Sequence, residues 1–364
     1  MFIRSITLFC MTVFSMVICY AESKEQPCLI RVHGVIMKPD KPETIYINVY
    51  DLKANEYVIY ESLNAGTNWR RVSSTRPVFQ DFIIDQKDSK IIYLPANDLV
   101  NYGGNKSIDS GVTWNFVATV PNIINPHNNA IMYSIGRGGI RKSIDGGDSW
   151  VDLKGNLKRC GAIGLAYQTP QILYAYCEGE PSPGIFKSIN AGEDWKMVLP
   201  IQGVRNLVVD PNNTEIVYAG TRFHGIYRSL DGGKLWNDIN RGLPKKPLSV
   251  PVVGGGEEAY KISSSRVPVN DNIESLVGDP IHSNILYAGM ASGIFKSIDF
   301  GINWRDINKG LPKSSVSALA INPKDPKVIY IGTLSSGVFK STDGGETWTP
   351  SSNGIACGPE VLVW

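Results

Sequence analysis

One pattern, S-x-[D/N]-x-G-x-x-W, constrains the fold of this chain more than any other feature. Its last copy lies in the stretch FKSTDGGETW, residues 339–348, and six similar copies precede it. Seven of the eight tryptophans end a copy, and Trp364 alone lies outside the pattern. Such repetition indicates an architecture in which each unit completes its core against its neighbours. The motif serines are Ser62, Ser107, Ser143, Ser188, Ser229, Ser297 and Ser341.

The spacing of the copies predicts a β-propeller. Successive motif serines are 45, 36, 45, 41, 68 and 44 residues apart, and a period near 40 residues is the length of one four-stranded blade. Most copies follow two apolar segments of the kind RNLVVDP and EIVYAGT, and no segment keeps a helical period. We therefore predict an all-β chain. It forms a single seven-bladed β-propeller of four-stranded antiparallel blades over residues 22–364, with an insertion at about 245–271 between blades 5 and 6.

The motif residues suit a tight hairpin between the third and fourth strands. An Asp or Asn side chain there can accept hydrogen bonds from backbone N–H groups of the turn. The glycine supplies a positive φ, and the tryptophan ring buries a large apolar surface. Two of the seven acceptors are asparagines, so the hairpin needs an acceptor rather than a charge, which favours a structural role. The acceptors are Asn64, Asp109, Asp145, Asn190, Asp231, Asp299 and Asp343.

The motif resembles the Asp-box, or BNR repeat, of sialidases, sortilin-type receptors, xyloglucanases and photosystem II assembly factors. The resemblance covers nearly all of the chain after residue 21 and implies the propeller fold, whereas function differs widely among these relatives. One seven-bladed ring is more similar to the assembly factors and bacterial repeat proteins than to ten-bladed or double propellers. The resemblance therefore implies a non-catalytic binding module, either a scaffold or assembly factor or a glycan or protein recognition protein. A glycoside hydrolase of sialidase or xyloglucanase type is the alternative.

The first 21 residues are typical of a secretory signal peptide. Arg4 precedes an apolar run from Ile6 to about Tyr20, and Ala21 offers a cleavage point. An uncleaved membrane anchor is the alternative, but the run is short and is diluted by serine and threonine. We expect export to the periplasm or the extracellular space, with no membrane span after cleavage.

Four cysteines follow the signal segment, and an exported chain permits them to form disulfides. Cys28 and Cys357 bracket the array, so a bond between them would fasten a closed ring. Cys160 and Cys177 flank an apparent hairpin and could face each other across two strands. Free buried thiols are the alternative for both pairs.

The candidate binding residues lie on the face that the resemblance assigns to ligands. In Asp-box propellers the box hairpins share one face, while the loops between second and third strands lie on the other with the blade-to-blade crossings. The predicted insertion, with glycines 254–256, would add a flap to that second face. The candidate binding residues are Arg137, Glu178, Glu180, Arg222, Phe223, His224, Glu257, Glu258 and Tyr260.

The sequence gives little support to other chemistries. Glycosidases need two carboxylates about 5 Å or about 6.5–9.5 Å apart. Glu178, Glu180, Glu257, Glu258, Asp98 and Asp51 could supply them, but nothing in the sequence shows two of them converging, and the Arg-Ile-Pro signature of sialidases is missing. The four histidines have no metal-ligand spacing, and no nucleotide-binding motif occurs, so we predict no metal and no cofactor. With 36 basic and 34 acidic residues the chain offers nucleic acid little attraction. We expect a monomer whose partner is a protein or a glycan.

Overall fold

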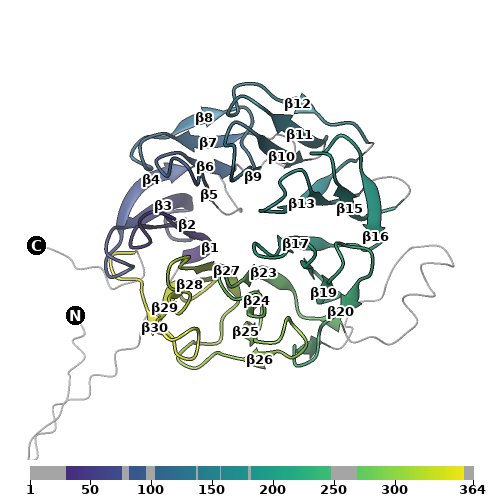
Figure 1. Ribbon diagram of the computed structural model, residues 1–364. Helices are drawn as coiled ribbons and strands as arrows, with labels where there is room; N and C mark the ends of the chain where they lie inside the picture. Colours follow the sequence, from purple (N-terminus) through teal and green to yellow (C-terminus); the bar gives the residue numbers. More distant parts are fainter. Residues whose placement is uncertain are drawn as a thin grey trace, which may run out of the picture.

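The computed structural model describes residues 30–75, 82–95, 103–136, 138–155, 157–178, 182–246 and 269–355. These residues form seven four-stranded antiparallel sheets in a ring around a central channel, which confirms the predicted propeller (Figure 1). The described ranges contain no helix, and hence no helix that is long and apolar enough to cross a membrane.

The blades follow the chain in order, and the first strand of each lies nearest the channel (Figure 1). Blade 1 comprises β1 (Ile30–Met37), β2 (Ile45–Asp51), β3 (Glu56–Ser62) and β4 (Arg70–Thr75). Blade 2 comprises β5 (Ile83–Ile84), β6 (Ile92–Pro95), β7 (Gly104–Ser107) and β8 (Asn115–Val117). Blade 3 comprises β9 (Ile123–Ile124), β10 (Met132–Gly136), β11 (Gly139–Ser143) and β12 (Val151–Asp152). Blade 4 comprises β13 (Cys160–Leu165), β14 (Leu173–Cys177), β15 (Gly184–Ser188) and β16 (Lys196–Leu199).

The second half of the ring contains three blades and a small extra sheet. Blade 5 comprises β17 (Val204–Val209), β18 (Val217–Thr221), β19 (Ile226–Ser229) and β20 (Asn237–Asp238). Blade 6 comprises β23 (Ile273–Gly278), β24 (Leu286–Met290), β25 (Gly293–Ser297) and β26 (Arg305–Asp306). Blade 7 comprises β27 (Val316–Ile321), β28 (Ile329–Thr333), β29 (Val338–Ser341) and β30 (Thr349–Pro350). Between blades 5 and 6, β21 (Lys245–Lys246) pairs with β22 (Val269–Asn270) at the two ends of the predicted insertion.

The Asp-box hairpins follow one hydrogen-bond scheme, of which blade 7 is an example. The Ser341 hydroxyl donates to Asp343 Oδ1 at 2.7 Å and accepts the Gly345 N–H at 2.8 Å. Asp343 Oδ1 also accepts the Thr347 N–H at 3.0 Å. Gly345 has a φ of 90°, a conformation that a side chain would oppose. The hairpin is therefore held by the spacing of its own residues.

Neighbouring blades are joined by tyrosines of the second strands. In blades 3, 4, 6 and 7 a buried tyrosine hydroxyl and the lysine paired with it on the third strand donate to one box carbonyl of the next blade. In blade 4, for example, Tyr174 and Lys187 donate to the Gly232 carbonyl at 3.0 and 2.7 Å. The other such carbonyls belong to Ala191, Gly344 and Ala65. Because the acceptor is in the next blade, each box also fixes the position of the blade before it.

The ring closes between blade 7 and blade 1 through the same kind of contact. Tyr330 donates to the Ala65 carbonyl at 2.7 Å, and the Trp69 indole N–H donates to the Ser351 carbonyl at 2.6 Å. Ser351 in turn donates its hydroxyl to the Gly66 carbonyl at 2.7 Å. Blades 1 and 7 each use four strands of their own, so the described chain closes without strand exchange. Cys28, Cys357 and Trp364 lie outside the described residues.

Five first strands carry a β-bulge at the same place near their start, and two first strands are short. The bulged residues are His33, Gly161, Arg205, Glu274 and Ser317. A bulge turns a side chain out of the regular alternation, so it re-aims these residues at the mouth of the channel. By contrast, β5 and β9 have two residues each.

Candidate functional site

The candidate site lies where second strands end and third strands begin, on the face opposite the box hairpins. Glu178 follows β14 directly, and Arg222, Phe223 and His224 form the loop from β18 to β19. The structure therefore places these four candidates on the adjacent blades 4 and 5. The remaining candidates lie outside the described residues: Arg137, Glu180, Glu257, Glu258 and Tyr260.

Within the loop of blade 5, the hydrogen bonds are made by its two end residues and by backbone groups. The Thr221 N–H and hydroxyl both donate to the Gly225 carbonyl, at 2.9 and 2.8 Å. The Thr221 hydroxyl oxygen also accepts the His224 N–H at 2.9 Å. None of these bonds uses a side chain of the three residues in between. The loop therefore presents those side chains without depending on them.

Blade 7 carries a loop with the same bonds and different side chains. Thr333 donates from its N–H and its hydroxyl to the Gly337 carbonyl, both at 2.9 Å, and accepts the Ser336 N–H at 2.9 Å. The residues between are Leu334, Ser335 and Ser336. The same backbone scheme thus displays Arg-Phe-His in blade 5 and Leu-Ser-Ser in blade 7.

The three displayed side chains of blade 5 form an exposed cationic and aromatic surface. The Arg222 guanidinium lies over the Phe223 ring, 5.1 Å from its centroid, and Phe223 is 49% exposed. Partial burial lowers the pKa of His224, so its ring is neutral at pH 7. The loop also contacts the crossing from blade 4, because the Arg222 N–H donates to the Gly203 carbonyl at 2.8 Å.

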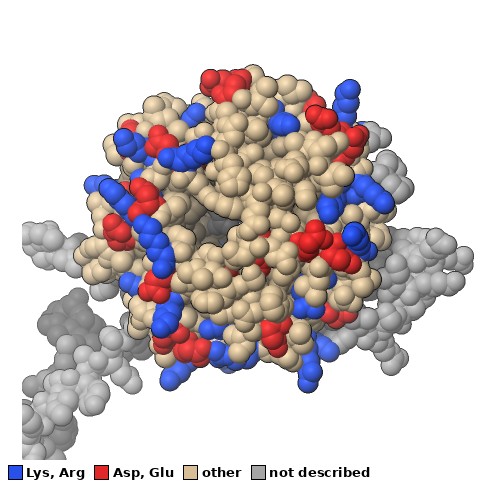
Figure 2. Space-filling view, viewed as in Figure 1, with Lys and Arg blue, Asp and Glu red and all other residues tan. Residues whose placement is uncertain are grey.

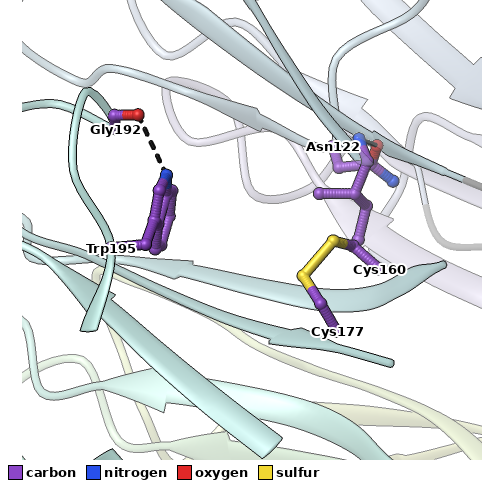
Figure 3. The surroundings of a disulfide bond; sticks show 6 residues. Asn122, Cys160, Cys177, Gly192 and Trp195 are labelled. Atoms are coloured by element: carbon purple, nitrogen blue, oxygen red, sulfur yellow. Dashed lines mark hydrogen bonds between the residues drawn. A yellow bond between two sulfur atoms is a disulfide. The ribbon is translucent and has the colours of Figure 1, made fainter. Parts of the chain in front are cut away.

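Blade 4 supports this loop through a disulfide-bonded strand pair. Cys160 and Cys177 face each other on β13 and β14 and are joined by a disulfide (Figure 3). Tyr176 precedes Cys177, and its hydroxyl oxygen accepts the Gly203 N–H at 3.0 Å. Glu178 follows Cys177, and its N–H donates to the Lys158 carbonyl at 3.0 Å. The disulfide therefore ties together the segments that position the Arg222 loop.

The box of blade 4 differs from that of blade 1 in the hydrogen bond that its tryptophan makes. The Trp195 indole N–H donates at 2.9 Å to the Gly192 carbonyl of its own hairpin (Figure 3). Trp69, by contrast, donates to the preceding blade in the ring and is 5% exposed. The tryptophans of the boxes therefore do not all bridge blades.

Four of the five bulged residues, all except Gly161, are polar and lie near the starts of the first strands, at the mouth of the channel. Arg205 of blade 5 pairs with Glu274 of blade 6 at 3.2 Å, and Glu274 also accepts the Asn272 side-chain N–H at 2.6 Å. Ser317 of blade 7 donates to the Val32 carbonyl of blade 1 at 2.5 Å. Burial, with a contribution from nearby Arg31, lowers the pKa of His33 to about 4. These contacts also link first strands of neighbouring blades.

The acidic side chains of the described loops and first strands on this face have partners already. Glu178 pairs with Arg159 at 3.5 Å, and Glu56 pairs with Arg71 at 2.7 Å. Asp51 accepts the N–H groups of its own turn at 2.9 and 3.0 Å. Together with the Arg205–Glu274 pair, these bonds hold the acidic side chains in place on the described part of the face.

Neither the charged side chains nor the possible metal ligands of the described residues gather in one cluster (Figure 2). Figure 2 shows Lys and Arg interspersed with Asp and Glu around the rim of the face in view, with a hollow at its centre. Within the described ranges no group of three His, Cys, Asp or Glu residues could hold a metal ion.

Comparisons with known proteins agree with this architecture. The BNR/Asp-box repeat model matches residues 339–350. The GH74 xyloglucanase of Xanthomonas campestris has a TM-score of 0.64 at 16% identity, over 91% of this chain and 55% of that one. YCF48 bound to D1 peptide has a TM-score of 0.55 at 12% identity, over 87% of this chain and 94% of that one. YCF48 from Cyanidioschyzon merolae has a TM-score of 0.56 at 10% identity, over 87% and 96%.

One similarity to a curated protein is seen in the sequence itself. The xyloglucanase Xgh74A of Acetivibrio thermocellus is 30% identical over 143 residues. This match spans 35% of the present chain but 16% of the enzyme. The chain thus spans about half of one xyloglucanase structure and a small part of this curated relative. At these identities the structural matches show the fold alone.

Proposed function

Because the chain is a seven-bladed propeller of Asp-box repeats, we propose that it is an exported, non-catalytic binding module that recognises a segment of a partner protein. Its binding surface is the loop face at blades 4 and 5, centred on Arg222, Phe223 and His224. The observation that carries the proposal is the pair of loops with one backbone scheme in blades 5 and 7. Since Leu-Ser-Ser satisfies that scheme, Arg-Phe-His is not required for the fold.

The displayed side chains suit a peptide. Arg222 offers several N–H donors in a fixed plane, which match carbonyl and carboxylate oxygens. Phe223 offers an exposed ring, and aromatic and arginine side chains are common anchors of protein interfaces. YCF48, a propeller whose chain this one covers almost completely, is known with a bound D1 peptide. That precedent supports a protein segment as the ligand class.

A glycoside hydrolase is the second candidate, favoured by the local identity to a xyloglucanase. Against it, Glu178 and Glu274 each pair with an arginine, whereas a glycosidase needs two carboxyl groups that converge on the substrate. The same paired carboxylates are compatible with a binding role.

The experiment that tests the proposal exchanges the loops. The wild-type propeller is used to select binders from a phage-displayed library of random linear peptides. Affinities of the selected peptides are then measured for the variant R222L/F223S/H224S, which carries the Leu-Ser-Ser of blade 7. The control variant L334A/S335A/S336A changes the corresponding loop of blade 7. We expect the blade 5 exchange to weaken binding at least roughly tenfold and the blade 7 control to retain it.

Two results would refute the proposal. The first is a selection that yields no peptide, or peptides that bind the blade 5 exchange as well as the wild type. The second is release of reducing sugar from xyloglucan by the wild type that is lost in Glu178→Gln, which would establish the hydrolase instead. Thermal melting of each variant verifies that the propeller remains folded.

A further inference from the structure

We propose that the channel wall between blades 2 and 3 contains a second binding site, an apolar slot that takes one neutral aromatic or branched aliphatic group. The slot has a volume of about 210 Å³. Its apolar lining consists of Ile36, Phe82, Ile83, Ile84, Ile123 and Ile124. It lies at the ends of β5 and β9, next to the turns that follow them. It is therefore on the face of the ring that carries the box hairpins, whereas the Arg222 loop lies on the other face.

The slot lies at the C-terminal ends of β5 and β9, where Ile84 and Ile124 pair with the second strands as the last residues of the longer first strands do. Between blades 4 and 5 the longer first strands touch directly, since an added Cβ at Gly164 would lie 3.4 Å from both Leu207 and Val209. Blades 2 and 3 have two-residue strands in this position, β5 and β9. Ile83 and Ile123 occupy the corresponding place in these blades, because they pair with Tyr93 and Tyr133 as Gly164 pairs with Tyr174, and there they line the slot.

Two of the polar side chains at the edge of the slot, those of Asp85 and Asn125, are bonded to the protein. Buried Asp85 accepts the Lys87 and Asp88 N–H groups at 2.8 and 3.2 Å, and the Asn129 side chain at 2.8 Å. Asn125 accepts the His127 N–H at 2.9 Å in the same way.

Two neighbouring polar groups are bonded as well. Asn122 accepts the Ile135 N–H at 2.9 Å, and the Lys87 ammonium donates to the His127 carbonyl at 2.5 Å. The slot therefore offers a ligand mainly apolar contact. A charged group would lose its hydration against the isoleucine and phenylalanine lining, so the site should favour a neutral group.

The size of the slot sets the ligand class. An apolar cavity of about 150 Å³ lined by Leu, Ile and Phe is large enough to bind benzene. A slot of about 210 Å³ therefore has room for a bicyclic aromatic group such as indole. Such a group could be a free small molecule or the side chain of a protein ligand, and both share this chemistry.

The test uses indole as the probe and indole-3-acetate as its charged counterpart, with binding measured by calorimetry on the full chain. Ile123→Trp fills the slot. Val208→Trp is the matched control, because Ile123 pairs with Tyr133 and Val208 pairs with Tyr218 at the equivalent place in blade 5. We expect saturable 1:1 binding of indole that weakens at least roughly tenfold in Ile123→Trp, persists in Val208→Trp, and is far weaker for indole-3-acetate. Competition between indole and a free tryptophan-containing peptide would identify a side chain as the natural occupant. If indole binds and no such peptide competes with it, the natural occupant is a small molecule.

Three results would overturn the proposal: no saturable binding of indole, equal binding to Ile123→Trp, or equal affinity for the charged counterpart. Crystals soaked in bromobenzene give a second measurement that does not depend on any variant. Anomalous density between Phe82 and Ile123 is the expected result, and its absence counts against the slot. We expect the loop exchange of blade 5 to lose peptide binding and to keep indole binding. The proposal for the slot and the proposal for the Arg222 loop can therefore be refuted independently.

Discussion

The buried tyrosine hydroxyls that join the blades should differ in their contribution to stability. Tyr287 donates to the Gly344 carbonyl at 3.1 Å, whereas the Tyr218 hydroxyl, equally buried, makes no hydrogen bond among the described residues. In blade 5 the third strand supplies Arg228 instead of a lysine, and its Nη1 donates at 2.7 Å to the Phe300 carbonyl, which corresponds to the carbonyl that Tyr287 reaches in blade 6. Tyr287→Phe and Tyr218→Phe therefore form a matched pair.

The expected magnitudes follow from the two environments. Tyr287→Phe removes one hydrogen bond, while the Gly344 carbonyl keeps Lys296 as a donor at 2.8 Å. The net loss should be about 1 kcal/mol, the usual value for one buried hydrogen bond. Tyr218→Phe removes a hydroxyl that folding strips of water without replacement, so it should leave the free energy of unfolding unchanged or raise it by up to about 1 kcal/mol.

Urea denaturation followed by tryptophan fluorescence measures both effects, because seven of the eight tryptophans lie in the boxes. The dependence of the unfolding free energy on urea must stay the same in both variants, so that a shift in midpoint reports stability. If Tyr218→Phe destabilises the protein as much as Tyr287→Phe, the assignment of the interblade bond to the Tyr287 hydroxyl is wrong.

Two further predictions concern acid and the closure of the ring. Hydrogen bonds from Thr113 and Ser149 lower the pKa values of Asp109 and Asp145 to about 2. Their contribution to stability is therefore present above the ordinary pKa of 3.8 and is lost as the pH falls through about 2. In acid titrations by circular dichroism, D109N/D145N should lose less stability than the wild type between these pH values, and an unchanged titration would contradict this. For closure, Ile30 and Ile355 belong to one core cluster, each two residues from a cysteine, so we expect peptide mapping to find a Cys28–Cys357 disulfide; alkylation of both thiols without reduction would exclude it.

The blade architecture could be predicted from sequence because each requirement of the box hairpin is local. Ser341, Asp343 and Gly345 satisfy one another within a few residues, so their spacing alone marks the turn. The interblade tyrosines are equally regular but gave no such signal. Tyr174 finds its acceptor 58 residues later, in a backbone carbonyl that no side-chain pattern identifies.

The candidate site was only partly predictable, for a related reason. Arg222, Phe223 and His224 stand out because they occupy a short loop whose position follows from the repeat. Arg205 and Glu274 reach the channel mouth through β-bulges, and a bulge leaves the apolar pattern of a first strand intact. The slot in the channel wall could not be predicted from the sequence either. FIIDQK at residues 82–87 reads like LVVDPN at residues 207–212, although one strand has two residues and the other six.

Comparison of the blades with one another separates structural residues from functional ones in this molecule. Where a residue recurs with the same bonds, as Thr221 and Thr333 do, the fold requires it. Where the bonds recur but the side chains differ, as between Phe223 and Ser335, the fold permits the difference and does not explain it. Phe223 lies exposed beneath the Arg222 guanidinium, where a ligand can contact both side chains. The blade 7 loop is thus an internal control for the blade 5 loop, and the exchange of their side chains tests binding at little risk to the propeller.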